Sequence, residues 1–63
     1  MAWIAVDRNG SEVMFNLYPE REKYFWYTYD DPYGRIFLPH GTIKKLIGRD
    51  LTWENEPIEL REE

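Results

Sequence analysis

The sequence contains no cysteine, only one histidine and no long apolar segment. Without cysteine there is neither a disulfide framework nor a zinc–thiolate site, so stability has to come from packing or self-association. The lack of cysteine also fits a reducing compartment. No apolar run approaches the roughly 20 residues of a membrane span, and the N-terminal MAWIAVDRNG has no features of a secretory signal. We therefore expect a soluble, cytoplasmic protein with no membrane segment.

An excess of positive charge is also missing, because 12 acidic residues outnumber eight lysines and arginines and the net charge is −4. This balance works against a broad electrostatic attraction to nucleic acid. Hydrophobic residues at 43% and aromatic residues at 17% are instead typical of a folded chain whose rings supply much of the core. With 63 residues, we expect a single domain over 1–63, with frayed residues at 61–63.

The N-terminal half has the pattern of a β-hairpin. A strand is predicted over 3–6, and Asn9-Gly10 favours a chain reversal because both residues tolerate positive φ. The next segment, 11–17, alternates apolar and polar residues as a strand with one buried side does. The predicted buried side consists of Val13, Phe15 and Leu17.

The segment KYFWYTY, residues 23–29, is aromatic on both faces of a predicted strand. A central strand covered on both sides would have this pattern, and so would an exposed aromatic surface that binds a partner. A turn is predicted over 30–34, with Gly34 available for positive φ, and 35–38 is predicted to be the returning strand.

After residue 39 the apolar period becomes helical. Ile43, Leu46 and Ile47 form one apolar stripe, Thr42 is predicted to be the N-cap, and Gly48 stands where a C′ glycine is favoured. The C-terminal residues 57–60 fit either an edge strand or an ordered tail.

These elements predict an α+β fold. We expect a small antiparallel β-meander of three to four strands with one short helix, at about 42–48, packed on it. The alternative is an SH3-like barrel in which the short helix precedes the last strand.

No chemical motif in the sequence meets the requirements of its chemistry. Gly41 and Gly48 are seven residues apart and Arg49-Asp50 follows, so the spacing of a phosphate-binding loop is not met. His40 lies in a predicted loop without an orienting partner, and no serine or threonine has a nucleophile context. We expect no catalytic residue, no cofactor and no metal site.

Two motifs resemble a group of short, uncharacterised bacterial and phage-associated proteins. They are W-I-A-V-D-x-x-G-x-E near the start and L-P-x-G-T-I-x-x-L-I-G-R-x-L-T-W-x-x-E-P-x-E-L near the end. The resembling residues are Trp3 to Val6, Asp7, Gly10, Glu12, Leu38, Pro39, Gly41 to Ile43, Leu46 to Arg49, Leu51 to Trp53 and Glu56 to Leu60. The resemblance implies a small cytoplasmic protein encoded by a prophage and implies no activity. It does not cover 18–33.

Aromatic density therefore gives the leading hypothesis about function. We expect a non-enzymatic protein that binds a protein partner or a second copy of itself, because interface cores favour such rings. The alternatives are a nucleic-acid-binding module and a phage inhibitor of a host nuclease. The candidate interaction residues are Tyr24, Trp26, Tyr27, Tyr29 and Tyr33. The candidate basic patch for nucleic acid is Lys44, Lys45 and Arg49.

Overall fold

Seven short elements follow one another along residues 2–61, the part of the chain that the computed structural model describes. They are β1 (Ala2–Val6), β2 (Glu12–Phe15), β3 (Glu20–Arg21), β4 (Trp26–Tyr27), β5 (Arg35–Leu38), α1 (Thr42–Ile47) and β6 (Ile58–Leu60). The predicted fraying at 62 and 63 lies outside the described residues.

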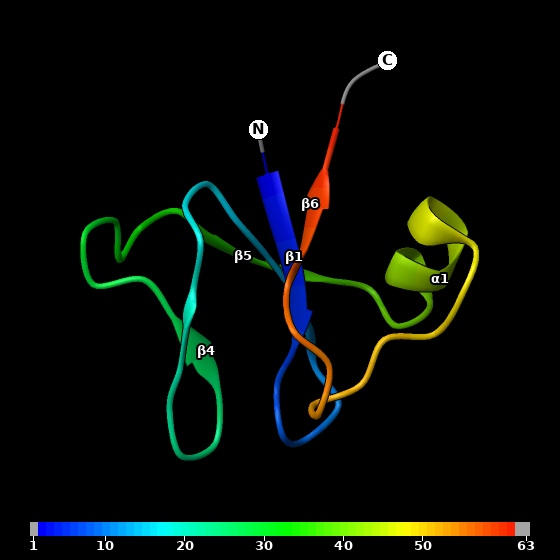
Figure 1. Cartoon of the computed structure of the whole chain (residues 1–63), viewed down its shortest axis with the longest axis horizontal. Coiled ribbons are helices and arrows are strands. Elements are labelled where there is room, and N and C mark those ends of the chain that lie inside the picture. The colour runs from blue at the N-terminus through cyan, green and yellow to red at the C-terminus, as the bar shows by residue number, and fades with distance from the viewer. Residues whose placement is uncertain (1, 62–63) are drawn as a thin grey trace.

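The main sheet has four antiparallel strands in the order β5-β2-β1-β6, and β3 and β4 form a separate two-stranded ribbon. Figure 1 shows α1 on one side of the main sheet and the ribbon containing β4 on the other. The predicted α+β class with a small antiparallel meander is confirmed. The SH3-like alternative is wrong, because the strands described in residues 2–61 form no closed barrel.

A tight turn joins β1 to β2, as the sequence predicts. The Gly10 amide donates to the Asp7 carbonyl at 2.9 Å, and the Asp7 amide donates to the Ser11 carbonyl at 2.8 Å. Only Gly10 has positive φ, at 91°, whereas Asn9 does not. Instead, the Asn9 side chain accepts a hydrogen bond from the Ser11 amide at 2.9 Å. This pattern is typical of a turn followed by a glycine bulge, in which one glycine supplies the left-handed conformation.

The core occupies both faces of the sheet. On the face that carries α1, the buried residues are Ile4, Val6, Ile43 and Leu51. On the ribbon face, they are Ala5, Val13, Phe15 and Trp26. Alternate residues of β1 and β2 therefore point into two different apolar layers, and the sheet is the middle of three layers.

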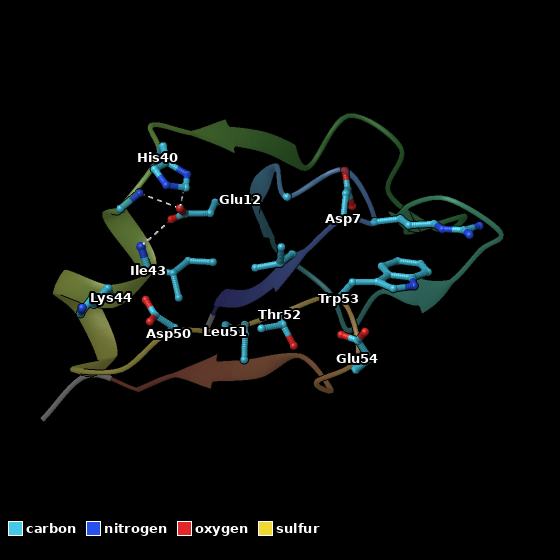
Figure 2. Close-up of a pocket in the computed structure, with 14 residues that line it drawn as sticks. Asp7, Glu12, His40, Ile43, Lys44, Asp50, Leu51, Thr52, Trp53 and Glu54 are labelled. Carbon is cyan, nitrogen blue, oxygen red and sulfur yellow. Dashed lines mark hydrogen bonds and ion pairs between the residues drawn. The ribbon is translucent and has the colours of Figure 1, made fainter.

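A carboxylate from the sheet holds the start of α1. Glu12 is only 8% exposed, and its two oxygens accept hydrogen bonds from the Gly41 amide at 2.6 Å and the Ile43 amide at 2.7 Å (Figure 2). Gly41 takes the cap position with φ of 93°, and no side chain of the cap residue itself contributes. The prediction of Thr42 as N-cap is therefore wrong: its hydroxyl donates to the Pro39 carbonyl at 2.6 Å.

Two predicted core positions are exposed. Leu17 is 44% exposed because β2 ends at Phe15, so residue 17 lies beyond the strand pairing. Leu46 is 53% exposed, and the contacts of α1 with the sheet core come from Ile43 and Ile47 instead. Gly48 ends α1 as predicted, with φ of 78°.

The strand predicted over 23–29 is wrong for most of its length. Only Trp26 and Tyr27 form strand β4, which pairs with β3, a strand that the sequence analysis did not predict. The segment 35–38 does form β5, but it pairs with β2 and not with β4. The chain between β4 and β5 therefore crosses from the ribbon to the edge of the main sheet.

Gly34 in this crossing is closely approached by two side chains and does not have a left-handed backbone conformation. Its φ is not positive, so that prediction is wrong. A Cβ atom at this position would meet the Asp31 carboxylate and would lie 2.9 Å from Asn16 Nδ2.

The C-terminal segment forms an edge strand and not a tail, because β6 pairs with β1, with Ile58 opposite Ile4.

We expect Glu12→Ala to lower the free energy of unfolding by about 2–4 kcal/mol, because one buried and one partly buried amide at the start of α1 lose their acceptor. Glu12→Gln keeps one acceptor oxygen and should lose less. Urea unfolding followed by tryptophan fluorescence measures both.

The matched control is Glu54→Ala, since Glu54 is exposed and should change stability by no more than about 0.5 kcal/mol. Equal losses for the Glu12 and Glu54 variants would contradict the role of Glu12.

Candidate interaction surface

A second buried carboxylate attaches the β3-β4 ribbon to the sheet. Asp7 is 4% exposed, and its Oδ1 accepts the Trp26 backbone amide at 2.9 Å. Its Oδ2 lies 2.9 Å from Nη2 of Arg35, with which it forms an ion pair. The Trp26 indole N–H also donates to the Val6 carbonyl at 3.0 Å. The Trp26 amide, the Trp26 indole and the Asp7–Arg35 ion pair together hold one side of β4 against β1.

The inner side of the ribbon is closed by a stacked arginine. The Arg21 guanidinium lies 4.3 Å from the Trp26 ring centroid and 4.5 Å from that of Trp53, and it donates to the Trp53 carbonyl at 2.6 Å. Arg21 and Trp26 are opposite each other in the β3-β4 pair. Directly opposed residues share a face, so their neighbours Glu20 and Tyr27 point outward together.

The outer side of the ribbon carries a row of three aromatic rings, which we call the aromatic row: Phe25, Tyr27 and Tyr29. The Phe25 and Tyr27 centroids are 6.1 Å apart at an interplanar angle of 82°, and those of Tyr27 and Tyr29 are 4.9 Å apart at 74°. Both are edge-to-face geometries. Phe25 is 38% exposed and Tyr29 is 59% exposed. The rings therefore pack on one another, with Phe25 and Tyr29 exposed and Tyr27 half-buried between them.

The structure brings together only two of the five aromatic residues singled out from the sequence, Tyr27 and Tyr29. Trp26 lies in the core, where a partner has no access to it. Tyr24 is exposed but stacks with two cations of its own chain, Arg8 and Lys23. Tyr33 is 95% exposed in the crossing segment and forms no aromatic pair with the described residues.

Two glutamates beside the aromatic row were not predicted as site residues. Glu20 is opposite Tyr27, and the Glu22 amide donates to the Phe25 carbonyl at 2.8 Å. The Glu22 side chain, burial and the charge of Glu20 raise the pKa of Tyr29. The only sequence feature that indicates this placement is the alternation of acidic and basic residues in ERE, residues 20–22. This alternation is informative only once the segment is known to form a strand.

The predicted basic patch is exposed but mixed in charge. Lys44 and Lys45 lie on α1, and Arg49 follows it. Lys44 borders the same groove as Asp50 and Glu54, as Figure 2 shows. The positive charge on this side of the helix is therefore accompanied by carboxylates.

This groove has a volume of about 850 Å³ and an apolar floor formed by Val6, Ile43 and Leu51. Its two buried carboxylates already have partners: Glu12 accepts two helix amides, and Asp7 binds the Trp26 amide and Arg35. The exposed His40 ring lies 3.5 Å from the Glu12 carboxylate. Because both carboxylates have structural roles, neither is free to orient a ligand in the groove, as far as residues 2–61 define it.

Comparisons of the chain with protein-family models, with curated proteins and with solved structures gave no match. Among residues 2–61, no helix has the length and apolar character needed to cross a bilayer. The same residues contain no group of three or more histidine, aspartate or glutamate side chains arranged to hold a metal ion.

We expect Glu22→Gln to lower the pKa of Tyr29 toward the ordinary value of 10.0, because the first cause of its raised pKa is the Glu22 side chain. Tyr18 is the internal control, since burial and Glu56 raise its pKa. The ¹³Cζ shifts of the labelled tyrosines, followed against pH, separate the two residues.

A raised tyrosine pKa favours the neutral ring in the fold. Its stabilising contribution is therefore complete below about pH 10 and disappears as pH rises through the folded-state pKa. An unchanged Tyr29 titration in the Glu22→Gln variant would show that the two side chains do not meet in solution.

Proposed function

We propose that this chain is a small, cytoplasmic, non-enzymatic interaction protein that binds a protein partner through the aromatic row on the outer side of the ribbon. One observation carries the proposal: Phe25, Tyr27 and Tyr29 form a row of packed rings in which Phe25 and Tyr29 are exposed. Aromatic side chains of this kind are enriched at the centres of protein interfaces.

The main competing explanation for the rings is that so short a chain needs them for its core. Both apolar layers, however, are filled by other residues, and the ribbon contributes Trp26 to the layer on its side. Tyr27 lies on the opposite side of the ribbon from that layer, and the rings of Phe25 and Tyr29 pack against it. Their outward placement supports a role in binding.

A rigid attachment favours binding as well. Asp7 and the Trp26 indole fix the inner side of β4, so the outer rings are held in place before a partner arrives. Such preorganisation reduces the ordering entropy lost on association. A protein partner and a second copy of the chain would both use this surface, and the prophage origin implied by the resemblance is compatible with either.

We expect Tyr27→Ser together with Tyr29→Ser to weaken partner binding at least tenfold, because tyrosine is enriched among the hot-spot residues whose truncation costs about 2 kcal/mol or more. The matched control is Lys44→Glu with Lys45→Glu on the opposite side of the sheet. The tagged full chain is used to isolate partners from cell lysate, and the affinity of each purified partner is then measured by calorimetry.

Partner loss in the lysine variant, with retention in the tyrosine variant, would place binding on the helix and contradict the proposal. Sedimentation equilibrium of the chain alone tests the self-association version, which a monomer at millimolar concentration would contradict.

A further inference from the structure

The aromatic row also indicates the chemistry of its partner, and the argument begins with the cations of this chain. Within residues 2–61, cations stack on Tyr24, Phe25, Trp26, Phe37 and Trp53. Tyr27 and Tyr29 have no such cation among the described residues, although their ring centroids are 4.9 Å apart, Tyr29 is exposed and Tyr27 is only half-buried. They are therefore open to a cation from another molecule.

The charges beside these two rings favour a cation. Glu20 is opposite Tyr27 on the outer side of the ribbon, and Glu22 lies next along the same side. The pKa of Tyr29, raised by both glutamates, agrees with this proximity.

The ribbon segment provides no basic side chain to neutralise the two glutamates on this side. Its two basic residues are used elsewhere: Arg21 stacks on the inner tryptophans, and Lys23 stacks on Tyr24. Carboxylates next to tyrosine rings that have no cation of their own form a surface complementary to a basic group.

We propose that Tyr27, Tyr29, Glu20 and Glu22 form a binding site for a lysine or arginine side chain in a basic segment of the partner protein. The rings receive the cation on their faces, and the two carboxylates pair with it from the β3 side. This inference rests on the proposed function, since it names the partner chemistry of the same surface.

The test is a titration of the ¹³C,¹⁵N-labelled full chain with a nonapeptide of alternating glycine with lysine or arginine, monitored by NMR. We expect shifts confined to 20–29, weakened by 0.5 M salt because the interaction is partly electrostatic. A matched peptide of glycine and glutamate should cause none. Shifts that instead map to the groove beside Asp50 and Glu54, or equal shifts with the acidic peptide, would overturn the proposal.

Substitutions distinguish the contribution of the rings to peptide binding from that of the charges. Tyr27→Leu and Tyr29→Leu should each weaken peptide binding about two- to fivefold, as expected for cation–π contacts at exposed sites. The double variant Glu20→Gln with Glu22→Gln should weaken peptide binding and remove most of its dependence on salt concentration. Tyr33→Leu and Glu54→Gln are the matched controls and should leave binding unchanged.

A folding check and a second readout keep the outcomes distinct. Each variant should retain the shifted indole N–H resonance of Trp26, which shows that the ribbon is still attached. If the partner of the wild-type chain depends on the aromatic row but the basic peptide does not bind, the cation site is overturned while the proposed function stands. If the partner is a second copy that binds without a basic segment, the cation site is overturned as well.

Discussion

Asp7 and Glu12 flank the turn between β1 and β2, and both carboxylates are buried although they belong to a chain of only 63 residues. Burying an ionised group is costly unless charged or polar partners compensate for the lost water. Asp7 is compensated by the Trp26 amide and Arg35, and Glu12 by the two helix amides. Each carboxylate thus fixes one outer layer to the central sheet.

These attachments divide the molecule into two sides with different properties. On the Glu12 side, α1 has only six residues and depends on the sheet for its first turn, since a helix of this length is not stable alone. On the Asp7 side, Trp26 is held inward, so the strand alternation directs Tyr27 outward. The aromatic row is in this sense a consequence of where Asp7 binds.

Local patterns in the sequence predicted the features that depend on local contacts. The hairpin at Gly10 and the helix end at Gly48 follow from the left-handed conformation that glycine adopts readily. Thr42 shows the limit of this approach: a hydroxyl at the right position predicts a cap, but a carboxylate 30 residues earlier supplies the acceptor. Such a contact depends on tertiary structure and leaves no local pattern.

The interaction surface was harder to predict for the same reason. The segment 23–29 is aromatic on both faces, so its sequence alone does not say which face is covered. Strand β3 consists of two charged residues, and it exists because the ribbon is docked on the sheet. Glu20 and Glu22 could therefore be assigned to the surface only after the pairing of β3 with β4 was known.

The most direct measurement of this arrangement is solvent paramagnetic relaxation of the ring and indole protons with a soluble gadolinium chelate. The structure predicts strong relaxation of the Tyr29 ring and protection of the Trp26 indole N–H, which is hydrogen-bonded to the Val6 carbonyl. Strong relaxation of the Trp26 indole together with protection of Tyr29 would mean that the ribbon presents its other face, and would contradict both the site and its proposed partner.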